Sequence, residues 1–228
     1  MLAALLDLVL PRACAGCASR GAALCTGCRA LLTGAPIGPV RPDPCPPGMP
    51  AVRALAPYDG PLKQLLLAHK EHGRLDLSAP LGAALAAVVA GFGTGDLVLC
   101  PAPSSRSAVR SRGYDHTARL ARAAAGGLGG GFVVRRLLVP ARAVRDQAGL
   151  SSEQRAQNLL GALRAVPAQP ARVLLVDDVV TTGATLVEAS RALVAQGHQV
   201  VGAAVLGATS RRRSPLRWEP LHPRPVEG

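Results

Sequence analysis

The stretch Val173-Leu174-Leu175-Val176-Asp177-Asp178-Val179-Val180-Thr181-Thr182-Gly183-Ala184-Thr185 decides the fold of this 228-residue chain. Its first four residues are apolar and two of them are β-branched, which favours a strand buried on both faces of a parallel sheet. A helical pattern from Thr185 to Gln196 follows, and Gly197 is its stop signal. We expect ligands to bind where such a strand ends, at the loop that leads into the helix.

The polar residues of this loop suit a sugar phosphate. Asp177 and Asp178 offer paired acceptors that can hold the vicinal hydroxyls of a ribose, or a metal ion beside it. Gly183 allows close approach of the backbone, and the free N–H groups of the following helix favour a phosphate. Hydroxyl donors come from Thr181, Thr182 and Thr185.

Nucleotide hydrolases and phospho-receiver domains also use an apolar strand that ends in acidic residues. The only lysines of the chain are Lys63 and Lys70, and neither follows a glycine. A Gly-Lys-Ser/Thr phosphate loop is therefore absent, and the downstream lysine of a receiver domain is missing as well. The alternative is an ordinary turn with exposed aspartates, but it does not explain why every polar residue of the run suits one ligand.

At these residues the chain resembles the type I phosphoribosyltransferases, which share a hydrophobic strand, two acidic residues and a Thr-Thr-Gly-type loop. The resemblance implies that Asp177 and Asp178 are the catalytic pair that holds the ribose hydroxyls of phosphoribosyl pyrophosphate. It also implies that Mg²⁺ bridges the pyrophosphate and the ribose. The 5′-phosphate would be held by Thr181, Thr182, Gly183, Ala184 and Thr185.

A second candidate anion site follows the apolar strand expected at Leu97 to Cys100. Hydroxyls and arginines at the carboxyl end of this strand suit a pyrophosphate, and a parallel sheet would bring them to the same edge as Asp177. The alternative is a solvated basic turn that leads into a helix from Asp115 to Ala125. The candidate pyrophosphate-binding residues are Ser104, Ser105, Arg106 and Arg112.

A long polar segment, residues 140–158, follows the strand expected at Phe132 to Val139. Its length predicts a mobile lid, which would exclude water from an oxocarbenium-like centre, and the alternative is an exposed charged loop. The lid residues would be Gln147, Arg155 and Asn158. The five histidines receive no catalytic role, because lone histidines are more often solvated or packed than functional.

Four of the six cysteines form two Cys-x-x-Cys pairs near the start of the chain. Thiolates at this spacing can converge on one tetrahedral zinc ion. A disulfide pair and a thioredoxin-type redox motif are the alternatives, but the cytoplasm is reducing and a redox motif needs no duplication. The predicted ligands are Cys14, Cys17, Cys25 and Cys28, whereas Cys45 and Cys100 have no partner at ligand spacing.

Composition and patterning divide the chain into four parts. Residues 1–33 hold a short helix, Leu2 to Leu10, and the zinc module, and 34–50 is a Pro/Gly-rich linker. Residues 51–209 form an α/β domain with a Rossmann-like parallel sheet, which begins with a strand at 52–56 and helices at 62–70 and 75–90. Residues 210–228 are a basic tail that we expect to be disordered.

The charge and hydropathy of the chain limit its location and partners. No segment reaches the length of a membrane span, and we expect the protein in the cytoplasm. The formal net charge of +12 comes almost wholly from arginine, which favours bidentate contacts to phosphate, so polyphosphates or nucleic acids are natural partners.

Across nearly its whole length the chain resembles the ComF family. The resemblance is carried by the cysteine pairs, Tyr58-Asp59-Gly60 with His69-Lys70, Pro101-Ala102-Pro103 with Arg112-Gly113-Tyr114, Gln147 with Arg155 and Asn158, and the Asp-Asp-Thr-Thr-Gly run. It implies a zinc module joined to a phosphoribosyltransferase-like domain, and a role in DNA uptake during natural competence with single-stranded DNA as a partner. Glu71 stands where the family usually has an aromatic residue.

Two functions are therefore expected. The first is a phosphoribosyltransferase that binds phosphoribosyl pyrophosphate and Mg²⁺. The second is a single-stranded DNA-binding adaptor that is not catalytic and uses the site only to sense phosphoribosyl pyrophosphate, although an aromatic content of 2% leaves few stacking platforms for bases.

Overall fold

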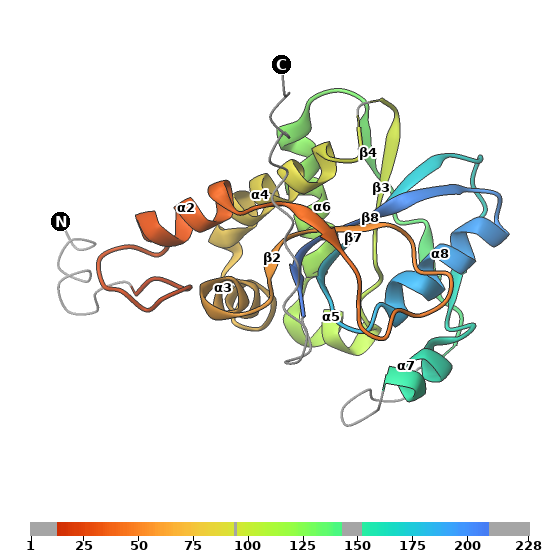
Figure 1. The fold of residues 1–228 in the computed structure, drawn as a ribbon, viewed down its shortest axis with the longest axis horizontal. Helices are drawn as coiled ribbons and strands as arrows, with labels where there is room; N and C mark the ends of the chain where they lie inside the picture. Colours follow the sequence, from red (N-terminus) through yellow and green to blue (C-terminus); the bar gives the residue numbers. More distant parts are fainter. Residues whose placement is uncertain (1–12, 94, 143–151, 210–228) are drawn as a thin grey trace, which may run out of the picture.

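A six-stranded, mostly parallel sheet forms the centre of the molecule (Figure 1). The computed structural model describes residues 13–93, 95–142 and 152–209. The strand order is β1-β2-β8-β7-β3-β4, in which β1 alone is antiparallel to its neighbour. The strands are β1 Gly38–Val40, β2 Val52–Pro57, β3 Leu97–Pro101, β4 Phe132–Val134, β7 Arg172–Val180 and β8 Gln199–Ala208.

Helices cover both faces of this sheet. One core contains Leu174 and Val176 of β7, and the other contains Val173 and Leu175, because successive side chains of a strand point to opposite faces. Helices α3 Gly60–Glu71, α4 Ser78–Ala90 and α6 His116–Leu128 pack on the first face, and α8 Ala184–Ala195 packs on the second. The expected α/β fold and its strand buried on both faces are therefore confirmed.

Strand β7 is longer than the apolar run predicted. It continues from Arg172 to Val180, so Asp177 and Asp178 lie within it rather than after it. The backbone of Asp177 pairs with Val205 of β8, because β8 is itself a ten-residue strand that supports β7 along its length. The carboxylates thus sit on a rigid strand near its carboxyl end.

The single strand predicted at Phe132 to Val139 is wrong. Exposed Arg135 and Arg136 interrupt it, and its second half forms β5 Leu138–Pro140, which pairs with β6 Leu163–Ala165 in a separate two-stranded sheet. The helix predicted at 75–90 begins instead with a 3₁₀ turn, Leu75–Leu77. The remaining helices are α2 Thr26–Gly34, α5 Arg106–Arg112 and α7 Ser152–Leu159.

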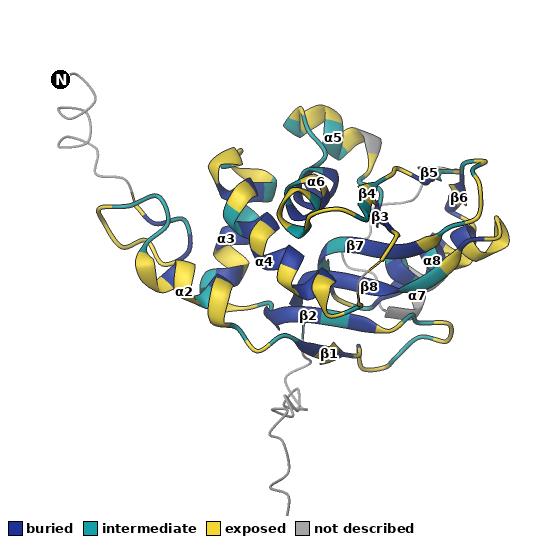
Figure 2. Cartoon of the chain, turned by 90° about the horizontal axis from the view of Figure 1, so that it is seen from above, coloured by how far each residue is buried: buried dark blue, intermediate teal, exposed yellow. Residues whose placement is uncertain are grey.

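The cysteine-bearing segment packs on the α3 side of the sheet. Cys14, Cys28 and Leu32 belong to the same buried cluster as Leu62 and Leu65 of α3. Figure 2 shows α2 beside α3 and α4, with an exposed outer surface. The Pro/Gly-rich segment after it contributes β1, whose Val40 is buried against the opposite face. The predicted helix at Leu2 to Leu10 and the tail 210–228 lie outside the described residues.

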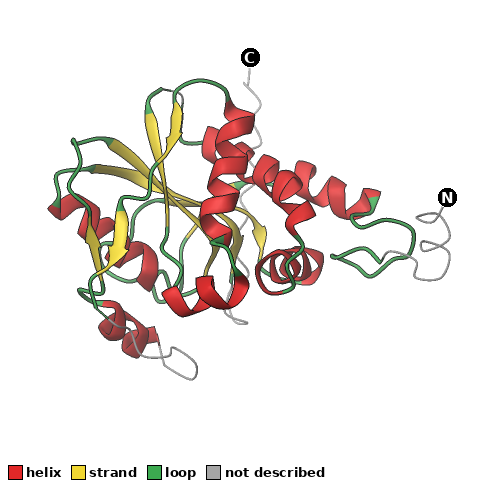
Figure 3. Ribbon diagram, turned by 180° about the vertical axis from the view of Figure 1, so that it is seen from behind, coloured by secondary structure: helices red, strands yellow, loops and turns green. Residues whose placement is uncertain are grey.

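Small residues let two of the helices approach closely. An added Cβ at Gly82 of α4 would lie 2.3 Å from the Cβ of Ala123 in α6. Figure 3, the view from behind, shows helices lying against the sheet. Across the described ranges, no helix combines the length and the apolar character that crossing a membrane requires.

We expect Gly82→Ala to lower the free energy of unfolding. Overpacking of the α4–α6 contact costs about 1–3 kcal/mol, which outweighs the gain in helix propensity. Gly126→Ala is the matched control, because Gly126 lies in α6 with open space around it and should gain about 0.5–1 kcal/mol. Urea denaturation measures both changes, and a Gly82→Ala variant as stable as the wild type would contradict the close contact.

Candidate functional site

A cavity of about 520 Å³ opens at the carboxyl ends of β3 and β7. It brings together Asp177 and Asp178 of the strand, and Thr181 and Thr185 from the loop and helix after it. The neighbouring strand β3 leads into the second group, because parallel strands end at the same edge of a sheet. This group contributes Ser104, Ser105 and Arg112.

Some predicted residues lie near the cavity without lining it. Gly183 caps α8 with a positive φ of 78°, and the Thr182 hydroxyl accepts a 3.4 Å hydrogen bond from the N–H of Ala184. These residues shape the loop that carries Thr181 and Thr185.

The predicted lid is described only in part. Asn158 lies in α7, and its carbonyl accepts a 2.9 Å hydrogen bond from Arg142, but it does not line the cavity. Gln147 lies outside the described residues, as does the side chain of Arg155. The geometry of a lid therefore stays a prediction.

Residues 106–112 form a helix, α5, rather than the turn considered in the sequence. The Ser105 hydroxyl caps it by accepting a 3.2 Å hydrogen bond from the N–H of Ala108. Arg106 begins the helix, although its side chain is outside the description. Arg112 ends the helix with a side chain only 10% exposed, and it faces the cavity.

Asp178 is the most heavily bonded group of the site. Its Oδ2 lies 3.0 Å from Nζ of Lys70 and 3.2 Å from Nε2 of His116, and its Oδ1 accepts a 2.9 Å hydrogen bond from the N–H of Val179. Burial would raise the pKa of this carboxyl, but the His116 hydrogen bond and the Lys70 charge outweigh it. Its pKa therefore lies below the usual range, and the group is ionised.

Asp177 has a different environment. Its Oδ1 accepts a 2.8 Å hydrogen bond from the N–H of Asp178, but among the described residues no cationic side chain pairs with it. Burial and the neighbouring Asp178 charge raise its pKa well above the usual range. A cavity-lining carboxylate without a counter-ion suits a hard cation such as Mg²⁺, which prefers oxygen ligands.

His116, to which the sequence assigned no role, lies in the cavity wall and is 4% exposed. Its Nδ1 lies 3.4 Å from Oγ of Ser104, so the imidazole connects that residue to Asp178. The imidazole thus links the two strand ends of the site. The sequence feature that could have pointed to His116 is the motif Arg112-Gly113-Tyr114, which ends two residues before this histidine.

The end of α3 completes the cavity. Lys70 and Glu71 line it, and Glu71 forms a 3.2 Å ion pair with Arg112. The Tyr114 hydroxyl donates a hydrogen bond to the carbonyl of His69. Sequence reasoning placed these residues in family motifs but could not place them in the site, because α3 lies about a hundred residues before β7 in the chain.

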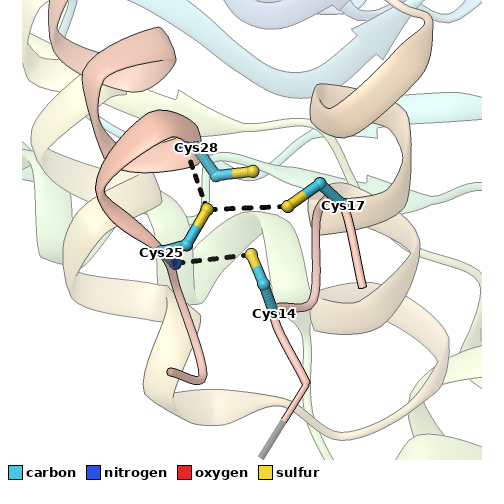
Figure 4. A group of neighbouring side chains, drawn as sticks. All are labelled: Cys14, Cys17, Cys25 and Cys28. Atoms are coloured by element: carbon cyan, nitrogen blue, oxygen red, sulfur yellow. Dashed lines mark hydrogen bonds between the residues drawn. The ribbon is translucent and has the colours of Figure 1, made fainter. Parts of the chain in front are cut away.

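The four cysteines form a compact cluster beside α3 (Figure 4). Their sulfur atoms all lie within 4.8 Å of one another. Four sulfurs bound to one tetrahedral zinc ion would be about 3.8 Å apart, so the cluster fits this ion. The structure therefore supports a metal site made of Cys14, Cys17, Cys25 and Cys28.

Backbone N–H donors lower the pKa of two of these thiols, Cys14 and Cys25, whereas burial raises that of Cys28. Burial raises the pKa of Cys14, but N–H donors, including a 3.4 Å hydrogen bond from Cys25, lower it to about 6. Gly16 allows the packing, because an added Cβ would lie 2.7 Å from the sulfur of Cys28 and 3.2 Å from Leu65. The cluster therefore rests directly on α3.

The sequence was compared with known protein families and with curated proteins. The family model for the phosphoribosyl transferase domain matches residues 132–219. This part of the chain is phosphoribosyltransferase-like. The match includes β7, the threonine loop, α8 and β8, so it covers the carboxylate pair and the loop that follows it. No curated protein matches the sequence.

The domain match and the cysteine cluster together support a protein like the type I phosphoribosyltransferases. The match begins at β4, so it includes neither the cysteines nor the Ser104 to Arg112 segment. The closer resemblance to the ComF family stays a prediction.

We expect the purified protein to contain about one zinc ion per chain. Cys28→Ser should lose most of this zinc and melt several degrees lower, because a thiolate ligand buried against α3 is replaced. Cys45→Ser is the control, since Cys45 lies outside the cluster. Elemental analysis and thermal melting test both variants, and full zinc content in Cys28→Ser would contradict the assignment.

Proposed function

We propose that the cavity binds phosphoribosyl pyrophosphate together with Mg²⁺, as a phosphoribosyltransferase. One observation carries the proposal: a carboxylate pair, a threonine loop at a helix N-terminus and an arginine-bearing segment all line one cavity at the carboxyl edge of the sheet. The phosphoribosyl transferase match over 132–219 supports the substrate class.

Different parts of the cavity bind different groups of phosphoribosyl pyrophosphate. Asp177 and Asp178 serve the ribose, and the N–H groups and hydroxyls of residues 181–185 hold the 5′-phosphate. Ser104, Ser105, Arg106 and Arg112 hold the pyrophosphate. Gln147, Arg155 and Asn158 belong to a segment that closes over the site and excludes water.

The reaction we propose is transfer at C1 of the ribose. An acceptor nucleophile forms a bond to C1 while the bond from C1 to the pyrophosphate oxygen breaks, and pyrophosphate leaves with its electron pair. The ionised carboxylate of Asp178, and that of Asp177 when it holds the cation, stabilise the positive charge that develops on the ribose. Bound Mg²⁺, held through Asp177, would neutralise charge on the pyrophosphate and so make it a better leaving group.

We also propose a cytoplasmic role in DNA uptake, with structural zinc in the cysteine cluster, as the ComF resemblance implies. A second candidate function is a non-catalytic adaptor that holds single-stranded DNA and senses phosphoribosyl pyrophosphate. The observation that favours it is the net charge of +12, which is carried mainly by arginine.

Asp177→Asn should weaken the binding of phosphoribosyl pyrophosphate in the presence of Mg²⁺ by roughly tenfold or more, because a charged ligand for the cation is lost. Asp96→Asn is the matched control, since Asp96 is exposed next to β3 and far from the ligand groups. Isothermal titration calorimetry measures both affinities. No binding to the wild type would refute the proposed ligand.

If the protein binds single-stranded DNA through arginines, its affinity should fall steeply with salt. Three phosphate contacts would give a loss of roughly 20-fold between about 50 and about 200 mM salt. Fluorescence anisotropy with a labelled oligonucleotide measures the slope. A flat salt response would argue against the adaptor function, and a parallel screen for pyrophosphate release with bases, nucleosides and DNA as acceptors tests the enzyme function.

A further inference from the structure

We propose that Lys70 is a further ligand-binding residue of the cavity, which binds the pyrophosphate group, and that Asp178 is a positioning residue that holds it there. This inference rests on the proposed function, since the ligand is phosphoribosyl pyrophosphate. It refines the role of Asp178, because one oxygen of this carboxylate then serves the lysine rather than the ligand.

The first step is that Oδ2 of Asp178 is fully occupied. Oδ1 is used by the N–H of Val179, and Oδ2 is shared by Lys70 and His116. The side chain is only 9% exposed. A ribose hydroxyl or a cation could reach Oδ2 only by displacing Lys70 or His116 from a buried position, which is costly, whereas Oδ1 keeps one lone pair.

The second step is that Asp177 has the opposite character. Its carboxylate lines the cavity and lacks a cationic partner among the described side chains. The two neighbouring carboxylates therefore differ in their partners, because Lys70 and His116 compensate the charge of Asp178 and no described side chain does so for Asp177. A sequence in which both stand side by side does not reveal this difference.

The third step is the position of the lysine. The side chain of Lys70 is 34% exposed, so its ammonium is accessible from the cavity while it contacts Asp178. An ammonium has three N–H donors, and Asp178 uses one of them. The other two are available to phosphate oxygens.

The fourth step shows why the pyrophosphate is the expected contact. His116 bonds the same Asp178 oxygen as Lys70 and reaches Ser104 through its other nitrogen. Glu71, the residue after Lys70, pairs with Arg112. The lysine therefore lies on the side of the cavity formed by the Ser104 to Arg112 segment, where a second cation complements the arginine.

The test compares three ligands by calorimetry in the presence of Mg²⁺: phosphoribosyl pyrophosphate, inorganic pyrophosphate and ribose 5-phosphate. Lys70→Met should weaken the binding of phosphoribosyl pyrophosphate and of pyrophosphate by roughly 10- to 100-fold. Its affinity for ribose 5-phosphate should not change. Lys70→Arg, which keeps the charge, should restore part of the affinity. Lys63→Met is the control, because Lys63 is exposed on the same helix. This variant should bind all three ligands as the wild type does.

A double-mutant cycle tests the role of Asp178. Asp178→Asn should change the affinities for the three ligands in the same way as Lys70→Met. The double variant should bind little more weakly than either single variant, because each change removes the same contact, an ammonium held in place by Asp178. Additive losses would show that Asp178 meets the ligand itself. Circular dichroism and thermal melting of each variant establish that it folds.

The outcomes separate this inference from the proposed function. If the wild type binds phosphoribosyl pyrophosphate and Lys70→Met binds it equally well, the role of Lys70 is refuted and the proposed function stands. An equal loss for ribose 5-phosphate would also refute the assignment to the pyrophosphate. If the wild type binds none of the three ligands, both proposals fail.

Discussion

The ionised carboxylate of Asp178 constrains the whole site, because a buried charge must be compensated from several directions. It lies on β7, and its partners Lys70 and His116 come from α3 and from the start of α6. A charge without partners in this position would cost several kcal/mol. Because this charge needs both partners, it holds α3 and α6 in place over β7 and so fixes the shape of the cavity between them.

Local patterns predicted much of the molecule. The apolar run before Asp177, the helical pattern up to Gly197 and the cysteine spacing depend on near neighbours in the chain. The structure contains a buried strand, a helix that ends shortly before Gly197 and a four-sulfur cluster at these places. Such features can be predicted because strand burial, helix capping and metal ligation each require a short, recognisable arrangement of residues.

The parts that could not be predicted depend on contacts between distant residues. Lys70 and His116 meet Asp178 across 108 and 62 residues, and no local pattern encodes such a distance. The break at Arg135 and Arg136 was hidden because apolar residues flank it on both sides. Residues 104–112 could be given a place at the sheet edge, but the helix they form depends on the Ser105 cap.

Gly183, which lies just before α8, bears on how the domain can be isolated. An added Cβ at Gly183 would lie 2.6 Å from the sulfur of Met49 and 3.3 Å from Pro42, so the Pro/Gly-rich segment rests on the loop that we propose binds the 5′-phosphate. A fragment cut at Ala51 would lose this cover together with β1. Because Met49 and Pro42 hold this loop in place, a protein without them would not keep the site as the full chain has it.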